Sequence, residues 1–155
     1  VLPAHEANLF PPFEFRKDRK HTGIAYHSLY GWAHDWIDFW TKTTAYATWD
    51  VEIVEAGTFE IEIKYALDPK DKGTKLVLEI DNQEISIDNL EPFLHGEFEN
   101  FDRVIREQEA PETDWKSVTI GDLPLTNGIK TIKISALEIP GEKSIELKEL
   151  LIKNK

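Results

Sequence analysis

Alternation of hydrophobic and polar residues is clearest between Thr48 and Leu67. The apolar positions come at every second residue, first Trp49, Val51 and Ile53, then Phe59, Ile61, Ile63 and Tyr65. Successive side chains point to opposite faces of a β-strand, so a period of two predicts two half-buried strands. Glu55-Ala56-Gly57 lies between them as a turn signal, and the stretch therefore predicts an antiparallel hairpin.

Similar short segments follow along the rest of the chain. They span residues 75–80, 84–88, 117–120, 129–136 and 144–153, with Gly, Pro, Asp and Asn between most of them. Short strands at near-regular spacing are typical of an all-β sandwich or barrel. The last segment also contains good helix formers at 146–150, but its alternation favours a strand. We predict one antiparallel β-sandwich over residues 22–155.

Two regions lack this pattern. Residues 1–21 contain three prolines and a basic cluster, and we expect an irregular arm that packs across the sandwich through Phe10, Phe13 and Phe15. Residues 90–114 are acidic and have no steady period, with a possible helical turn at 98–105. Long insertions of this kind are commonly functional or mobile.

Composition excludes several classes of function. The chain has no cysteine, which rules out disulfides, thiolate zinc sites and cysteine nucleophiles. No apolar run approaches the length of a transmembrane helix, so we expect no membrane insertion. The net charge of -11 would repel a phosphate backbone, which disfavours nucleic acid as a partner. A start at Val1 without methionine suggests an excised domain or a processed product.

The segment 30–40, YGWAHDWIDFW, carries the strongest binding signal. Trp32, Trp36 and Trp40 are four residues apart, a spacing that returns to the same face in both a helix and a strand. A sugar ring can stack its C–H face on a flat aromatic ring while polar groups bind its hydroxyls. The polar residues available between the rings are His34, Asp35 and Asp38. The alternative is that two of the three tryptophans fill the core.

The stretch around Glu55-Ala56-Gly57 resembles the family 6 type carbohydrate-binding modules, in which a polar turn and an AGTY sequence link two such strands. The resemblance is closer still to the β-sandwich module beside the catalytic domain of bacterial sulfatases of the N-acetylgalactosamine-6-sulfatase type. It spans about residues 22–153 and is strongest at 49–66 and at SALEIP, 135–140. This resemblance implies a galactose-binding-like jelly roll that binds a glycan without catalysis, attached to an enzyme that is secreted or periplasmic.

The resemblance also implies candidate ligand-binding residues. Trp40 matches the family's stacking tyrosine, and Glu146 matches a polar residue on the final strand that is usually asparagine. The loop that supplies the second ring in the family is matched by 110–114, which has none, and Trp115 matches a more buried tryptophan. The predicted ligand-binding residues are Trp40, Trp36, Trp32, Asp38 and Glu146.

A structural calcium ion is common in the resembling modules, and oxygen ligands would suit it. Of the family's N-terminal glutamate pair only Glu6 remains here, so Glu6 is the one predicted metal ligand. His27 and His34 are seven apart and without a zinc motif, which favours ordinary polar or core positions.

Two function hypotheses follow. The first is a glycan-binding accessory module, and the second is a structural module that docks on the catalytic domain through its aromatic N-terminal segment. The basic cluster 16–21 could clamp a sulfate or carboxylate, but a solvated charge run is the favoured interpretation. The sequence has no G-x-S-x-G segment, no phosphate-binding loop and no sulfatase nucleophile signature, so we expect no catalytic activity.

Overall fold

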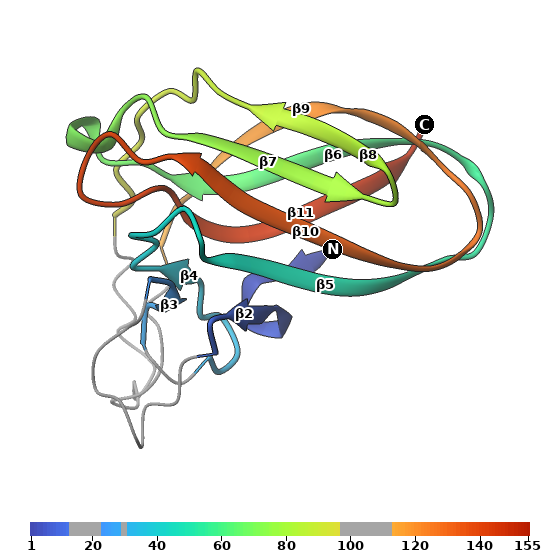
Figure 1. Cartoon of the computed structure of the whole chain (residues 1–155), viewed down its shortest axis with the longest axis horizontal. Helices are drawn as coiled ribbons and strands as arrows, with labels where there is room; N and C mark the ends of the chain where they lie inside the picture. The colour runs from blue at the N-terminus through green and yellow to red at the C-terminus, as the bar shows by residue number, and fades with distance from the viewer. Residues whose placement is uncertain (13–22, 29–30, 97–112) are drawn as a thin grey trace.

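The computed structural model describes residues 1–12, 23–28, 31–96 and 113–155. Its strands form two antiparallel sheets that face each other (Figure 1). The elements are β1 (Leu2–Pro3), η1 (Ala4–Glu6), β2 (Asn8–Phe10), β3 (Ala25–Tyr26), β4 (Ile37–Asp38), β5 (Tyr46–Ile53), β6 (Gly57–Ala66), η2 (Pro69–Asp71), β7 (Lys75–Ile80), β8 (Gln83–Ile87), β9 (Lys116–Leu125), β10 (Gly128–Glu138) and β11 (Glu146–Asn154). The predicted all-β sandwich is confirmed.

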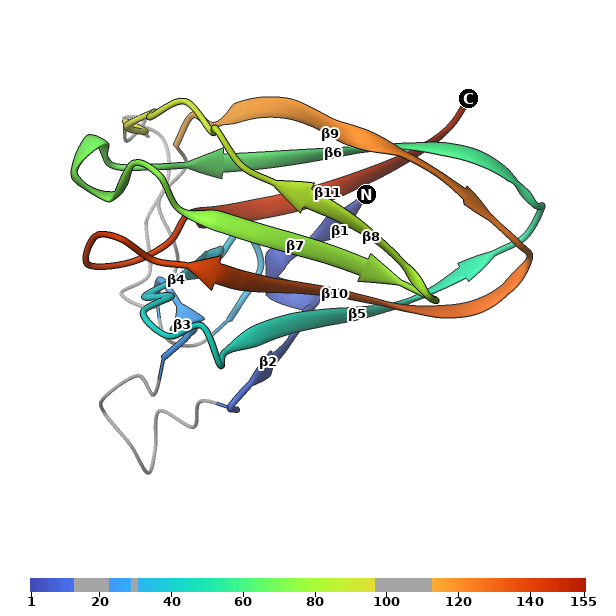
Figure 2. The ribbon, with the colours of Figure 1, turned by 45° about the horizontal axis from the view of Figure 1, so that its top comes forward.

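The two sheets interleave segments that are distant in sequence. One sheet has the order β3-β4-β11-β6-β9, with β1 also paired to β11, and the other has the order β2-β5-β10-β7-β8. Figure 2 shows the layer of β5, β10 and β7 against the layer of β11, β6 and β9. No helix in the described part of the chain is long and apolar enough to cross a membrane.

The core lies between the sheets and comes from alternate residues of the long strands. Ile61 and Ile63 of β6 face Ile132 and Ile134 of β10, and all four side chains are fully buried. Burial of an aliphatic side chain of this size contributes about 1.5–3 kcal/mol. The intervening residues are mostly charged and lie at the surface, as the alternation predicts.

The predicted hairpin between 48 and 67 is wrong in its pairing. Its two strands, β5 and β6, form as expected, but they belong to different sheets: β5 pairs with β2 and β10, whereas β6 pairs with β11 and β9. Gly57 lies at the point where the chain crosses from one sheet to the other. Both strands direct their apolar residues into the same core, so their alternation is identical to that of a hairpin and does not reveal the partner.

Other strand predictions are confirmed. Strands β7 and β8 form a hairpin around Asp81, whose φ of 53° suits a tight turn, and the last segment is a strand. The first ten residues are more regular than expected, because β1 joins one sheet and β2 joins the other. Phe10 stacks on Tyr46 with 4.9 Å between ring centroids. Phe13, Phe15, the basic cluster 16–21 and the possible helical turn at 98–105 lie outside the described residues.

Candidate functional site

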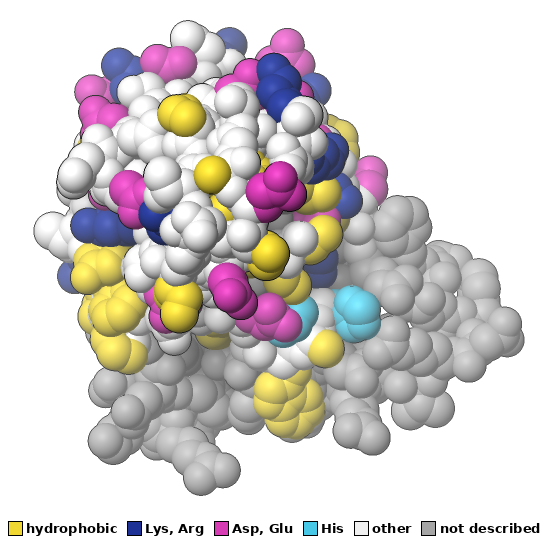
Figure 3. Space-filling view, turned by 90° about the vertical axis from the view of Figure 1, so that its right-hand side faces the viewer, with side chains coloured by type: hydrophobic (Ala, Val, Ile, Leu, Met, Phe, Trp, Pro, Cys, Tyr) yellow, Lys and Arg dark blue, Asp and Glu magenta, His cyan; other side chains and the backbone are white. Residues whose placement is uncertain are grey.

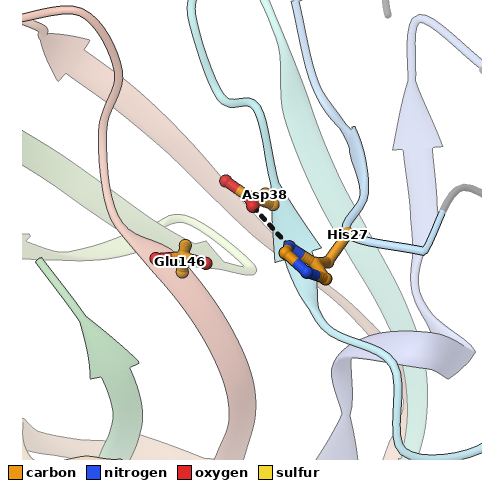
Figure 4. Close-up of side chains that lie close together, drawn as sticks. All are labelled: His27, Asp38 and Glu146. Atoms are coloured by element: carbon orange, nitrogen blue, oxygen red, sulfur yellow. Dashed lines mark hydrogen bonds and ion pairs between the residues drawn. The ribbon is translucent and has the colours of Figure 1, made fainter. Parts of the chain in front are cut away.

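The strands β3 and β4 and the start of β11 meet at one end of the sandwich, toward the left in Figure 1. Ionisable side chains gather there. We call His27, Asp38, His95, Lys143 and Glu146 the loop-end cluster. Asp38 is the last residue of β4, which pairs with β3 on one side and β11 on the other. This short strand carries Asp38 to His27 and brings Glu146 near both, and Figure 4 shows these three side chains facing a common space.

Asp38 is almost completely buried and is well supplied with hydrogen-bond donors. One oxygen, Oδ2, lies 2.8 Å from His27 Nδ1, and the other, Oδ1, accepts from Lys143 Nζ at 2.7 Å and from the Phe39 backbone N–H at 2.6 Å. Burial alone would raise the pKa of this carboxyl, but the bonds to His27 and Lys143 outweigh it and lower the pKa to about 2. Asp38 is therefore ionised at every physiological pH.

The His27 side chain is more exposed than that of its partner Asp38. Burial lowers its pKa, but the hydrogen bond to Asp38 and the charges of Asp38, Glu146 and Asp35 together raise the pKa above the ordinary 6.5. The ring also stacks on Trp36, with centroids 4.2 Å apart. His27 thus combines a carboxylate partner with an aromatic support, which holds its imidazole in one orientation.

Lys143 and Glu146 complete the charged part of the cluster. Lys143 Nζ lies 2.7 Å from Asp38 Oδ1 and 3.7 Å from Glu146 Oε2, so one ammonium group bridges two carboxylates. Burial opposes the charged form of Lys143, but Asp38 and Glu146 raise its pKa overall. Glu146 Oε1 accepts the Trp36 indole N–H at 3.0 Å and lies 3.2 Å from His95 Nε2.

Two tryptophan rings, Trp36 and Trp115, pack against the His27 and His95 rings of the cluster. Trp36 contacts His27 face to face and meets Trp115 and His95 at steep angles, with ring centroids 5.1 and 5.5 Å apart. His95 in turn stacks on Trp115 at 5.0 Å. Trp115 is half-buried, so part of its surface faces solvent beside the cluster. This arrangement combines a flat apolar surface with hydrogen-bonding groups, the combination that sugar recognition uses.

The loop between β10 and β11 is held in place by Asp71. This side chain is fully buried, and its Oδ1 accepts from the backbone N–H groups of Glu142 at 2.8 Å and Lys143 at 3.4 Å. Gly141 packs so closely that an added Cβ would lie 2.3 Å from the same oxygen. Asp71 therefore fixes the backbone from which Lys143 reaches the cluster.

The structure corrects the prediction that Trp36 and Trp40 offer stacking surfaces. Both side chains are 0% exposed, and Trp40 donates its indole N–H to the Ala45 carbonyl at 3.2 Å. Trp32, in contrast, is 44% exposed. The spacing of four does not give a common face because His34 and Phe39 have φ values of 70° and 52°, which break the regular path of the chain.

The polar candidates also take separate roles. Asp38 and Glu146 come together, as described above. Asp35 is buried and holds its own loop by accepting from Ser28, Gly31 and Trp36. Glu6 is well exposed, and among the described residues it joins no group of three potential metal ligands. The calcium ion at Glu6 stays a prediction.

Three members of the cluster were not among the predicted site residues. The sequence predicts an ordinary polar or core position for His27, which lies just before the Trp-rich segment 30–40. Lys143 follows a Pro-Gly turn and is indistinguishable from a surface lysine in the sequence. His95 comes from the segment after β8, which returns to the sheet through the isolated bridge between Leu67 and Phe93. No period in the sequence predicts that contact.

Comparison with known proteins adds information on the fold. Neither a scan against models of protein families nor a search of curated proteins finds a match to the chain. Solved structures do match. A family 35 carbohydrate-binding module from Clostridium thermocellum has a TM-score of 0.63 at 10% identity, over 100% of this chain and 97% of that one. A second match is CBM6cm-2 from Cellvibrio mixtus lichenase 5A, solved in complex with cellotriose, with a TM-score of 0.57 at 12% identity, over 99% and 95%.

A third match is part of a larger enzyme. The GH26-CBM35 β-(1,4)-mannanase of Podospora anserina has a TM-score of 0.61 at 15% identity. The match covers 99% of this chain, which spans only 27% of the mannanase chain. Identities this low establish a shared fold and no more. The chain has the β-sandwich fold seen in carbohydrate-binding modules of families 6 and 35.

Proposed function

We propose that this chain is a non-catalytic carbohydrate-binding module that binds a glycan at the loop end of the sandwich. The observation that carries the proposal is the match of the whole chain to whole carbohydrate-binding modules, over at least 95% of their length in two families. Exposed aromatic surface beside hydrogen-bonding groups at the loop end supports the same function. The mannanase match supports a place beside a catalytic domain in a longer chain.

In this proposal the stacking residue is Trp32 and not Trp40, which the family resemblance implies. Trp32 is the one of the three spaced tryptophans with an exposed side chain, and its carbonyl accepts from the Asp35 N–H at 3.0 Å, which anchors the turn that carries it. Trp115 supplies a second, half-buried ring at this end. Partly exposed His27 and Lys143 supply donors for sugar hydroxyls.

Binding to a panel of neutral, uronate-containing and sulfated polysaccharides tests the proposal, by affinity electrophoresis followed by calorimetry. We expect one class to bind and Trp32→Ala to weaken that binding by about tenfold, since an aromatic contact contributes up to about 1.5 kcal/mol beyond its buried area and 1.4 kcal/mol corresponds to tenfold. Ile129→Ala is the matched control, because Ile129 is 81% exposed at the opposite end of β10. The absence of any binding glycan would refute the proposal.

We also propose what kind of enzyme this module is attached to. The resemblance to sulfatase-associated modules supports an attached sulfatase or other glycan-degrading enzyme in a secreted or periplasmic setting, with no role for nucleic acid at a net charge of -11. In this setting the module would raise the local concentration of substrate at the catalytic domain. Removing the module should then raise the KM for polymeric substrate and leave the KM for a small soluble substrate unchanged.

Docking on the catalytic domain without glycan binding is the second candidate function. It is favoured by a hollow of about 360 Å³ at the end of the sandwich opposite the cluster, lined by Val1, Leu2, Val54, Phe59 and Ile152 among others. Figure 3 shows this end, where hydrophobic side chains lie among acidic and basic ones. If docking is the function, Val54→Glu in the parent enzyme should lower the thermal stability of the catalytic domain, and Trp32→Ala should not.

A further inference from the structure

Negative charge exceeds positive charge in the interior of the loop end. Asp38 is 2% exposed and the Glu146 side chain is 13% exposed, and Lys143 is the lysine that forms ion pairs with both of them among the described residues. Buried carboxylates without compensating charge are costly. The Asp38 and Glu146 carboxylates therefore share one lysine ammonium group, and a further cation can be accommodated beside them.

Three donor atoms of suitable type already lie close together. His27, Asp38 and Glu146 each offer one ligand atom, and these atoms all lie within 4.8 Å of one another. His27 Nδ1 and Asp38 Oδ2 are only 2.8 Å apart. Ligands of a tetrahedral ion with bonds near 2.05 Å are about 3.3 Å apart. Small movements of Glu146 and a slight opening of the His27–Asp38 pair would give that geometry.

Outer contacts hold the two carboxylates in a fixed orientation. Asp38 Oδ1 accepts the Phe39 N–H at 2.6 Å, which leaves Oδ2 directed at His27. Glu146 Oε1 accepts the Trp36 indole N–H at 3.0 Å, which leaves Oε2 toward Lys143. Metal-binding carboxylates commonly have such partners on their second oxygen, and these partners tune affinity by 10- to 100-fold.

Lys143 already places one positive charge beside the candidate donor atoms. Its ammonium group lies between Asp38 Oδ1 and Glu146 Oε2, at 2.7 and 3.7 Å. Its backbone is fixed by Asp71, but its side chain is long and about one-quarter exposed, so the ammonium group can move outward without a change in the loop. A metal ion entering the cluster would take over the charge that Lys143 now supplies.

We propose that the loop-end cluster binds a divalent transition-metal ion of the zinc type through His27, Asp38 and Glu146, in place of the Lys143 ammonium group. One imidazole nitrogen and two carboxylate oxygens suit zinc or cobalt better than calcium, which takes oxygen ligands. Three protein ligands leave one coordination position open for water or a ligand. The site differs in place and ligands from the calcium predicted at Glu6, and it does not depend on glycan binding.

The test is calorimetry with Zn²⁺ on the chelator-treated full chain at pH 7.5, together with visible absorption of Co²⁺. We expect calorimetry to show one Zn²⁺ ion bound per chain. The visible absorption bands of bound Co²⁺ should be those of an ion with a low coordination number. His27→Gln should weaken binding by at least about tenfold. Lys143→Met should tighten it by about tenfold, because it removes the competing charge. A gain of affinity cannot arise from misfolding, so this variant keeps the test decisive if His27→Gln is unstable.

His5→Gln is the matched control for the histidine variant. His5 lies 4.0 Å from Glu6 and takes no part in the cluster, so its removal should leave Zn²⁺ affinity unchanged. The proposal is overturned if neither the wild-type chain nor Lys143→Met binds Zn²⁺ at one-to-one stoichiometry. It is also overturned if His5→Gln abolishes binding while His27→Gln does not, or if Ca²⁺ at equal concentration displaces the transition metal.

Discussion

Single residues at the loop end combine burial with ionisation, which links the stability of the fold to pH. Asp38 and His27 form the central pair, and each shifts the pKa of the other away from its ordinary value. The folded state favours charged His27 and charged Asp38 more than the unfolded state does. The two shifts act at opposite ends of the pH range, so their effects can be separated in one series of measurements.

The first prediction concerns this pH dependence in metal-free buffer. The raised pKa of His27 contributes stability that is complete below pH 6.5 and is lost as pH rises through the folded-state pKa. The lowered pKa of Asp38 contributes stability that is present above 3.8 and is lost as pH falls toward about 2. Urea unfolding across pH should therefore show the highest stability between about pH 4 and 6.5.

His27→Gln should remove the decline above pH 6.5 and leave the acid limb in place. A variant that keeps the full alkaline decline would show that another group is responsible. His5→Gln serves as the control, because His5 is not in contact with Asp38.

The second prediction separates the tryptophans by role. Trp40 is fully buried, so Trp40→Ala should lower the free energy of unfolding by about 3–5 kcal/mol. Trp32 is 44% exposed, and Trp32→Ala should lower it by clearly less, about 1 kcal/mol. Urea unfolding measures both values. A Trp40→Ala chain that is fully stable but deficient in glycan binding would restore Trp40 as the stacking residue.

Single elements show how far the sequence predicts this fold. Strands β5, β6, β7, β8, β10 and β11 could be placed within a few residues, because alternation reports which side chains face the core. The partner of β5 could not be predicted, since a strand that crosses to the other sheet has the same alternation as one that returns in a hairpin. Short strands such as β3 and β4 depend on tertiary contacts and give no periodic signal.

The third prediction concerns the loop between β10 and β11. Gly141→Ala would place a Cβ against Asp71 and should cost about 1–3 kcal/mol of stability. Asp71→Ala leaves the Glu142 N–H unpaired and should cost about 1–3 kcal/mol, whereas Asp71→Asn keeps the acceptor oxygen and should cost less. Chemical unfolding ranks the two Asp71 variants. Equal losses for Asn and Ala would show that the buried charge, and not the hydrogen bond, anchors the loop.

The whole molecule has two ends with different surface chemistry. The loop end carries the cluster and half-buried Trp115, the turn before β4 carries Trp32, and the far end carries the hollow around Val54. The sequence placed Asp38, Glu146 and the tryptophans in one candidate site, and Asp38, Glu146 and Trp36 do meet there. It could not predict His95 or Lys143, because each reaches the cluster from a loop whose path is set by contacts with other strands.

The most direct test of the central claim is an NMR titration of the isotope-labelled chain with the glycan that binds most tightly in the panel. The chain has five tryptophans, and their indole N–H signals are assigned from single Trp→Phe variants. The account predicts that the Trp32 signal and backbone signals near Lys143 shift on binding, with no change around Val54. Shifts confined to the far end, with Trp32 unaffected, would contradict it.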